Sequence, residues 1–236
     1  EKSFRHPPLP TAVRQQKTRL KALELFASRG FTQTGMRELA AHMGVTPGSL
    51  YNHMDSKQTL LFELIEELYE CLLNGPAHFP LTQRNPNDRL QMLLTTHINL
   101  HGSKGMHFLV AERELHCLDS QQADTIQNLR AMYEQQFVNV LAEVGDMEIT
   151  PQLRALAKSS VSLLNNLPLW FAQDSLDPAR RTQLMNSMAS ASIAGALQDL
   201  KHSSDNTFFV ATGVTDGNLV SGVRKQGNLV ITESIV

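Results

Sequence analysis

Residues 36–53 constrain the fold of this chain more than any other segment. Apolar residues at helical spacing predict a short helix over 36–43, and Gly44 follows at the position where helices commonly end. Thr46 and Pro47, a capping residue and a first-turn proline, predict that another short helix begins at once. Two short helices joined by a glycine-containing turn form a helix-turn-helix. The segment therefore predicts a unit whose second helix can lie in the major groove of duplex DNA.

The segments on either side predict two further helices around this unit. Apolar residues at i, i+3 and i+7 predict a helix that ends before Gly30. Thr34 is expected to cap the first helix of the pair. Asp55 is expected to cap a strongly apolar fourth helix, with Gln58 at the reciprocal position of a capping box.

The rest of the chain predicts a second helical domain and a tail of different composition. After a proline-rich linker, apolar residues recur at helical spacing to about residue 201, and Pro168 is expected to kink or end one of these helices. Gly, Thr and Val with period-two hydrophobicity then predict strands. The expected fold is all-α with a short β-like tail, divided into a flexible arm (1–11), a helix-turn-helix domain (12–58), a second helical domain (59–203) and a Gly-rich tail (204–236).

Charge is unevenly distributed along the chain. The formal net charge is −2, yet residues 1–60 hold nine Lys/Arg against four Asp/Glu, and the remaining residues hold 12 against 19. A basic first quarter on an acidic body indicates a polyanionic partner. A solvated helical face that is basic for no functional reason is an equal alternative.

Composition narrows the class of protein. Two cysteines, Cys71 and Cys117, exclude a disulfide framework. No apolar run reaches the ~18 residues that a membrane span needs. A reduced chain in the cytoplasm, without a membrane partner, is therefore expected.

Residues around the second helix of the pair are candidates for DNA contact. Gly48 lacks a side chain and lets the backbone approach DNA closely, and Asn52 is able to read adenine with two hydrogen bonds. Lys57 falls in the first turn of the fourth helix, where the helix dipole disfavours a cation unless a phosphate binds there. The alternatives are an ordinary surface lysine for Lys57 and an aromatic packed between helices for Tyr51.

At these residues the chain resembles the TetR family of transcriptional regulators. The resemblance rests on residues 23–27 (LELFA), 36–45 (MRELAAHMGV), 46–53 (TPGSLYNH) and the fourth-helix start at 56–57. It covers roughly residues 12–70. Met54 stands where the family usually has Phe, and Gly35 stands where a bulkier residue is common.

The resemblance implies a homodimer bound to a double-stranded DNA operator. The dimer is expected to form through the last two helices, at about 151–171 and 178–201. The residues implied to contact phosphates are Thr34, Thr46, Ser49, Tyr51 and Lys57, and those implied to face the groove are Pro47, Gly48, Asn52 and His53. Members of the family are most often repressors that a small-molecule effector releases.

The second domain resembles the branch of the family that responds to acyl-CoA. The resemblance covers about residues 85–200, on the segments 97–101 (HINLH), 109–115 (LVAEREL), 129–134 (LRAMYE) and 165–171 (NNLPLWF). It implies an effector-binding and dimerisation domain that takes a small apolar or acyl-CoA-type effector and no other cofactor. The candidate effector-binding residues are His97, His101, Arg113, Arg130, Tyr133, Trp170 and Phe171, with the two guanidinium groups suited to phosphates.

Each of these candidates has a structural alternative. Arg113 and Arg130 can form ion pairs with neighbouring glutamates, and the aromatic side chains can simply belong to the core. His97 and His101 have the i, i+4 spacing of metal ligands, and His107, His116 and Cys117 lie nearby in the sequence, which leaves a sensing metal site as an alternative. Because this pattern defines no third ligand, no metal is expected.

The tail carries a separate resemblance. Residues 208–219, 222–224 and 232–234 resemble an internal segment of class II fructose-1,6-bisphosphatases. The rest of such an enzyme is missing, and no nucleophile elbow, Walker loop or HExxH motif is present. The sequence therefore favours a regulator without catalytic residues. An architectural DNA binder without an effector and a fragment of a sugar bisphosphatase are the alternatives.

Overall fold

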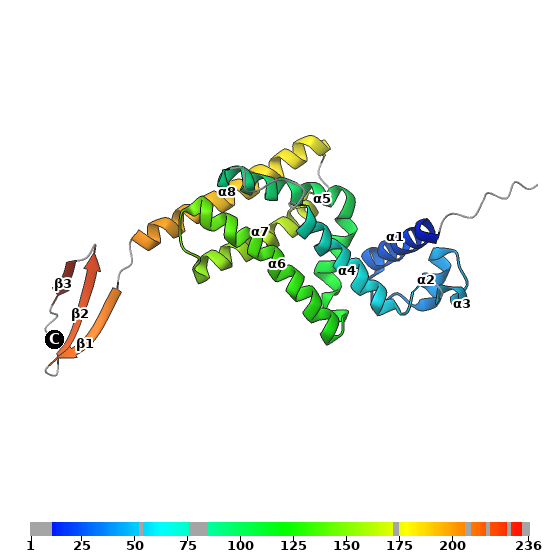
Figure 1. Cartoon of the computed structure of the whole chain (residues 1–236), viewed down its shortest axis with the longest axis horizontal. Coiled ribbons are helices and arrows are strands. Elements are labelled where there is room, and N and C mark those ends of the chain that lie inside the picture. Colours follow the sequence, from blue (N-terminus) through cyan, green and yellow to red (C-terminus); the bar gives the residue numbers. More distant parts are fainter. Residues whose placement is uncertain are drawn as a thin grey trace, which may run out of the picture.

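The computed structural model describes residues 11–51, 54–75, 85–171, 175–205, 209–215, 218–225 and 228–232. Within these residues the chain forms a helical body followed by three strands (Figure 1). The elements are α1 (Thr11–Arg29), α2 (Met36–Met43), α3 (Pro47–Leu50), α4 (Lys57–Asn74), α5 (Pro86–Glu114), η3 (Leu115–Cys117), α6 (Ser120–Gly145), α7 (Pro151–Trp170), α8 (Pro178–Asp205), β1 (Phe209–Thr215), β2 (Asn218–Lys225) and β3 (Asn228–Thr232). The predicted all-α class with a β-like tail is confirmed.

The helix-turn-helix is formed by α2 and α3, packed against α1 (Figure 1). Gly44 has the left-handed backbone conformation (φ 74°, ψ 32°) that the turn requires and that glycine adopts without strain. Leu39 and Leu50, both fully buried, bring the two short helices into one core. Phe26 and Phe31 meet edge to face, with ring centroids 5.3 Å apart, and close that core on the side of α1.

Helix capping differs from the prediction at two positions. The Thr46 hydroxyl accepts a 3.2 Å hydrogen bond from the Ser49 amide and caps α3, as predicted. Thr34 does not cap α2, because its hydroxyl donates to the Gly30 carbonyl (2.8 Å) and Gly35 occupies the cap position. Ser56, not Asp55, caps α4, because its hydroxyl accepts from the Thr59 amide at 2.9 Å.

The second domain is built around α5, which contacts α1, α4, α6, α7 and α8. Its core contains three fully buried aromatic side chains, Phe108, Tyr133 and Phe137. The backbone of α5 departs from helical geometry at Lys104 (φ −119°, ψ 15°), between Gly102 and Gly105. Pro168 lies in the last turn of α7, which ends at Trp170.

The tail forms an antiparallel sheet of order β1-β2-β3, with Phe209 paired with Arg224 and Ser221 with Thr232. Strands were predicted for this segment. No helix in the described ranges is long and apolar enough to cross a membrane.

Candidate nucleic-acid interface

One edge of α3 faces solvent. Thr46, Pro47 and Gly48 are exposed, Ser49 is half-buried, and a side chain added at Gly48 would meet no atom within 4 Å. Tyr51 directly follows α3 and is 60% exposed, so it is not an aromatic packed between helices. We call these five residues the α3 edge. The other two predicted groove residues, Asn52 and His53, lie outside the described residues.

Lys57 lies at the start of α4, as predicted, and groups of the protein itself contact its ammonium. Its Nζ donates hydrogen bonds to the carbonyl oxygens of Phe31 (2.8 Å) and Thr34 (2.9 Å) and lies 4.1 Å from the centre of the Phe31 ring. Burial lowers the pKa of Lys57, while the nearby Cys117 and Glu114 oppose that shift. Carbonyl oxygens and an aromatic face therefore surround the cation at the start of α4.

Thr34 is also not available to DNA in this arrangement. The residue is fully buried, and its hydroxyl is used by the Gly30 carbonyl. The loop between α1 and α2 turns this side chain into the core, and its phosphate contact stays a prediction from the sequence.

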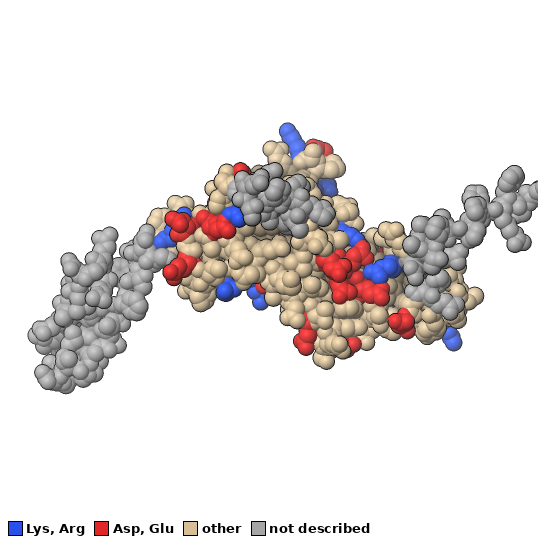
Figure 2. Space-filling view, in the orientation of Figure 1, with Lys and Arg blue, Asp and Glu red and all other residues tan. Residues whose placement is uncertain are grey.

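Some of the basic side chains in the first sixty residues form ion pairs with acidic side chains of the same chain. Arg29 pairs with Glu38, and Arg19 pairs with Glu63 and Glu67 of α4. Figure 2 shows acidic side chains gathered beside basic ones on this face of the helical body. Arg37 on α2 is exposed. The basic character of this quarter therefore reflects both structural ion pairs and an exposed surface.

A cavity of about 630 Å³ lies between α5, α7 and α8. Most of its lining is apolar, and the polar groups on its wall are Asn99, His101, Arg181 and Thr182. The lining residues are Ile98, Asn99, His101, Gly102, Gly105, Met106, Leu109, Pro168, Leu169, Pro178, Arg181, Thr182 and Met185. Its size is within the range typical of small-molecule sites.

Of the seven predicted effector residues, His101 lines this cavity. Its ring stacks on Phe108 (3.6 Å between centroids), and burial lowers its pKa to about 4. His97 is fully buried behind it, its Nδ1 2.9 Å from the Tyr133 hydroxyl, and burial and His101 lower its pKa. His97, His101 and Tyr133 thus form a group of polar side chains in the interior of the second domain, and His101 is the member that lines the cavity.

The other four predicted residues lie elsewhere. Arg113 is exposed and donates to the Ala27 carbonyl at the end of α1 (3.3 Å). Arg130 is half-buried on α6, and neither arginine forms an ion pair with Glu114 or Glu134 in the part of the chain that the structure describes. Trp170 is 64% exposed, and Phe171 packs at the border of the core. None of these four residues is among those that line the cavity.

Sequence reasoning missed Glu67 of α4. Its carboxylate accepts hydrogen bonds from Arg19 (2.9 Å) and from Lys104, and it lies 3.8 Å from Nε2 of His107. Burial raises the pKa of Glu67, but the hydrogen bonds from Lys104 and Arg19 outweigh burial and hold it below its usual value. These partners are about 40 residues away in the sequence, so no local pattern signals the contact.

The comparisons with known proteins agree with this architecture. The family model "Bacterial regulatory proteins, tetR family" matches residues 20–64, and a "Tetracyclin repressor-like, C-terminal domain" matches residues 83–198. The model of bacterial fructose-1,6-bisphosphatase matches residues 173–236, which include α8 and the tail noted above.

Individual relatives match this chain at low sequence identity. The transcriptional repressor KstR2 of Mycolicibacterium smegmatis is 26% identical over 149 residues, which are 62% of this chain and 72% of that protein. KstR2 of Rhodococcus jostii is 32% identical, but the match spans only 37% of its length.

Solved structures share the fold. The ketosteroid regulator KstR2 of Mycobacterium tuberculosis superposes with a TM-score of 0.67 at 20% identity, over 77% of this chain and 94% of that one. AibR, solved with isovaleryl coenzyme A and operator DNA, has a TM-score of 0.62 at 20% identity, over 74% and 97%. With both domain models matched in order along the helical body, the chain belongs to the TetR family of DNA-binding transcriptional regulators.

Proposed function

We propose that this regulator is a homodimeric repressor that leaves its operator when a small apolar or acyl-CoA-type effector enters the cavity between α5, α7 and α8. The observation that carries this proposal is the cavity itself, of about 630 Å³, set against the kink of α5. An architectural DNA binder would have no use for such a space in its second domain.

The α3 edge is the proposed DNA contact. Its residues are Thr46, Pro47, Gly48, Ser49 and Tyr51, and the exposed start of a helix reaches base edges and phosphates first. Asn52 and His53 remain predictions from the sequence. Phosphate contacts would set the register, and the groove-facing residues would select the sequence.

The proposed dimer uses α7 and α8. Leu184, Met188, Ala191 and Gly195 are exposed at i, i+4, i+7 and i+11 of α8 and form an apolar stripe with small residues at one end. Trp170, at the end of α7, is exposed as well. A two-fold pair through this face would place two α3 edges on a palindromic operator.

The chemistry of the cavity favours an acyl chain. Its apolar lining from Ile98, Leu109 and Met185 suits hydrocarbon, and Thr182 offers a hydroxyl for a hydrogen bond to a thioester. Two fold relatives support this class of ligand: one is named a ketosteroid regulator, and the other was solved with isovaleryl coenzyme A.

A physical connection runs from the cavity to the DNA-binding domain. Gly102 and Gly105 line the cavity, and Lys104 between them donates to Glu67, which accepts from Arg19 of α1. An effector that changes the kink of α5 would move Lys104 and thereby alter its ion pair with Glu67. Because Glu67 also binds Arg19, the orientation of α1 would change as well. Such a population shift needs a coupling of ~1–3 kcal/mol, or roughly 5- to 150-fold in operator affinity.

The test begins with duplexes selected by the purified chain from a random library. Fluorescence anisotropy then measures affinity for the selected duplex with short-chain, long-chain and sterol-side-chain CoA thioesters, with free coenzyme A as the control. We expect at least one thioester to weaken binding about fivefold or more while free coenzyme A has little effect. Specific DNA binding that no thioester changes would overturn the effector part of the proposal.

A further inference from the structure

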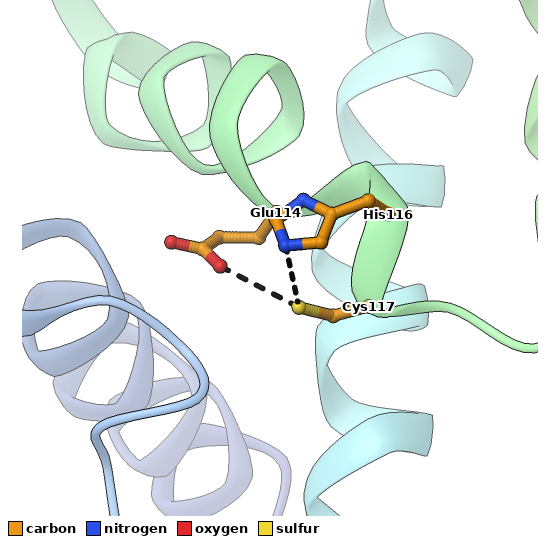
Figure 3. A group of neighbouring side chains, drawn as sticks. All are labelled: Glu114, His116 and Cys117. Carbon is orange, nitrogen blue, oxygen red and sulfur yellow. Dashed lines mark hydrogen bonds between the residues drawn. The ribbon is translucent and has the colours of Figure 1, made fainter.

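Three side chains with metal-binding chemistry meet where the second domain touches the helix-turn-helix domain. They are Glu114, the last residue of α5, and His116 and Cys117 of η3 (Figure 3). Cys117 Sγ lies 3.4 Å from His116 Nε2 and 3.7 Å from Glu114 Oε2. The three ligand atoms lie within 4.8 Å of one another.

The side chains of this cluster make few hydrogen bonds within the described residues, and these are long. Glu114 is only 9% exposed, and its carboxylate accepts from the Cys117 thiol. Lys57 lies close enough to interact electrostatically with Glu114 and Cys117, but its ammonium donates to backbone carbonyls. A divalent cation would therefore be a stronger partner for this carboxylate than the groups it now contacts.

We propose that Glu114, His116 and Cys117 form a binding site for a zinc-type divalent cation. Thiolate, imidazole and carboxylate are the donors that zinc prefers. Bonds of about 2.3 Å to sulfur and about 2.0 Å to nitrogen and oxygen, in tetrahedral geometry, place such donor atoms about 3.5 Å apart. The two separations measured here are already close to that value.

The surroundings of the site allow a fourth ligand to the ion and balance the charge of the ion. His116 is exposed and Cys117 is half-buried, so an ion can enter from solvent and keep a water ligand. A thiolate and a carboxylate together neutralise a divalent ion, so the neighbouring Lys57 would meet no net positive charge.

The site borders the DNA-binding domain. Gln58 of α4 donates to the Cys117 carbonyl (2.9 Å), and Thr32 Oγ1 lies 3.7 Å from Cys117 Sγ. A bound ion would hold the end of α5 and η3 in one conformation, beside the loop between α1 and α2.

The experiment uses Co²⁺ as a spectroscopic probe on the metal-free full chain. We expect a thiolate-to-cobalt charge-transfer absorption at one equivalent, which Zn²⁺ removes by competition, with proton release on binding. Cys117→Ser should abolish this absorption, and Cys71→Ser, the matched control at the other free cysteine, should retain it. His116→Ala, at an exposed position, should weaken Zn²⁺ affinity at least about tenfold without loss of helical circular dichroism.

Three results would overturn the proposal: no charge-transfer absorption in the unmodified chain, an absorption that persists in Cys117→Ser, or a Zn²⁺ affinity that His116→Ala leaves unchanged. None of these measurements requires DNA or effector, so their outcome is independent of the proposed function.

Discussion

Arg19 of α1 and Glu67 of α4 are joined by a hydrogen bond of 2.9 Å between Nη2 and Oε2. The other oxygen of the same carboxylate accepts from Lys104, the residue at which α5 is kinked. One carboxylate thus connects the helix that supports α2 and α3 with the segment of α5 that lines the cavity.

Glu67→Gln tests this connection. The amide keeps the shape but loses the charge that holds Arg19 and Lys104 together, so the free energy of unfolding should fall by about 1 kcal/mol. The response of operator affinity to effector should fall below about twofold while effector binding persists. Anisotropy titrations and calorimetry measure the two quantities. Glu70→Gln, at an exposed position of α4, is the control, and an undiminished response in Glu67→Gln would exclude this route of coupling.

Lys57→Met tests the structural role of Lys57. The variant keeps the aliphatic stem but leaves the Phe31 and Thr34 carbonyls without their charged donor, so the free energy of unfolding should fall by about 1–2 kcal/mol. Urea denaturation measures this loss, with the exposed Lys158→Met as control. A stability equal to that of the unmodified chain, together with a salt slope of DNA binding lower by ~1, would instead restore the phosphate contact predicted from the sequence.

The contrast between Thr46 and Lys57 shows what a sequence can predict here. Thr46 and Gly44 act through neighbours one to four residues away, so the local pattern identified the turn, the cap and the helix boundaries. The Lys57 ammonium instead meets carbonyls 23 and 26 residues earlier, which become its partners only after α1, α2 and α4 have packed. Local sequence patterns predicted the helices and the turn. Which polar groups remain free to contact a ligand depends on long-range packing, which these patterns do not contain.

The pH dependence of stability follows from three buried histidines. Burial lowers the pKa of His101 and His107 to about 4, and burial together with His101 lowers that of His97. Below about pH 6.5 these histidines are therefore protonated in the unfolded chain but remain neutral in the folded chain. The free energy of unfolding consequently falls as pH drops from about 7 to 5. Each neutral histidine contributes roughly 1–2 kcal/mol to this fall. Glu67 acts in the same direction at lower pH, because its lowered pKa stabilises the fold above the ordinary value for glutamate and this stabilisation is lost below that value.

Urea denaturation at several pH values checks this dependence. His107→Gln removes one titrating group beside Lys104 and Glu67, so its stability should depend less steeply on pH. A stability that stays flat between about pH 7 and 5 in the unmodified chain would contradict burial of these rings in neutral form.

Met188→Glu tests the proposed dimer. Met188 is 41% exposed in the middle of the apolar stripe of α8, and a carboxylate there would be desolvated in the interface. We expect the dimer to dissociate at micromolar concentration while helix content is unchanged, as measured by light scattering after gel filtration. Gln183→Glu, exposed on the same helix but outside the stripe, should remain dimeric. Persistence of the dimer in Met188→Glu would place the interface elsewhere.

The cavity between α5, α7 and α8 shows why the second domain was less predictable. Local spacing predicted the helices, and one of the residues chosen from the sequence, His101, lies on the cavity wall. Trp170 and Arg113 do not line the cavity, because the rotation of each helix about its axis depends on neighbours from distant segments. Leu169, one residue from Trp170, lines the cavity instead.

Two glycine substitutions, measured side by side, test the whole account most directly. An added methyl meets no atom of the protein within 4 Å at Gly48 or at Gly105, so both variants should fold. Gly48→Ala should weaken binding to the selected duplex about tenfold or more and leave binding of the active CoA thioester unchanged, because its methyl stands between the α3 edge and DNA. Gly105→Ala should show the reverse, with DNA affinity intact and effector affinity reduced. DNA affinity that Gly48→Ala leaves unchanged, in a folded protein, would contradict the claim that the α3 edge binds the duplex.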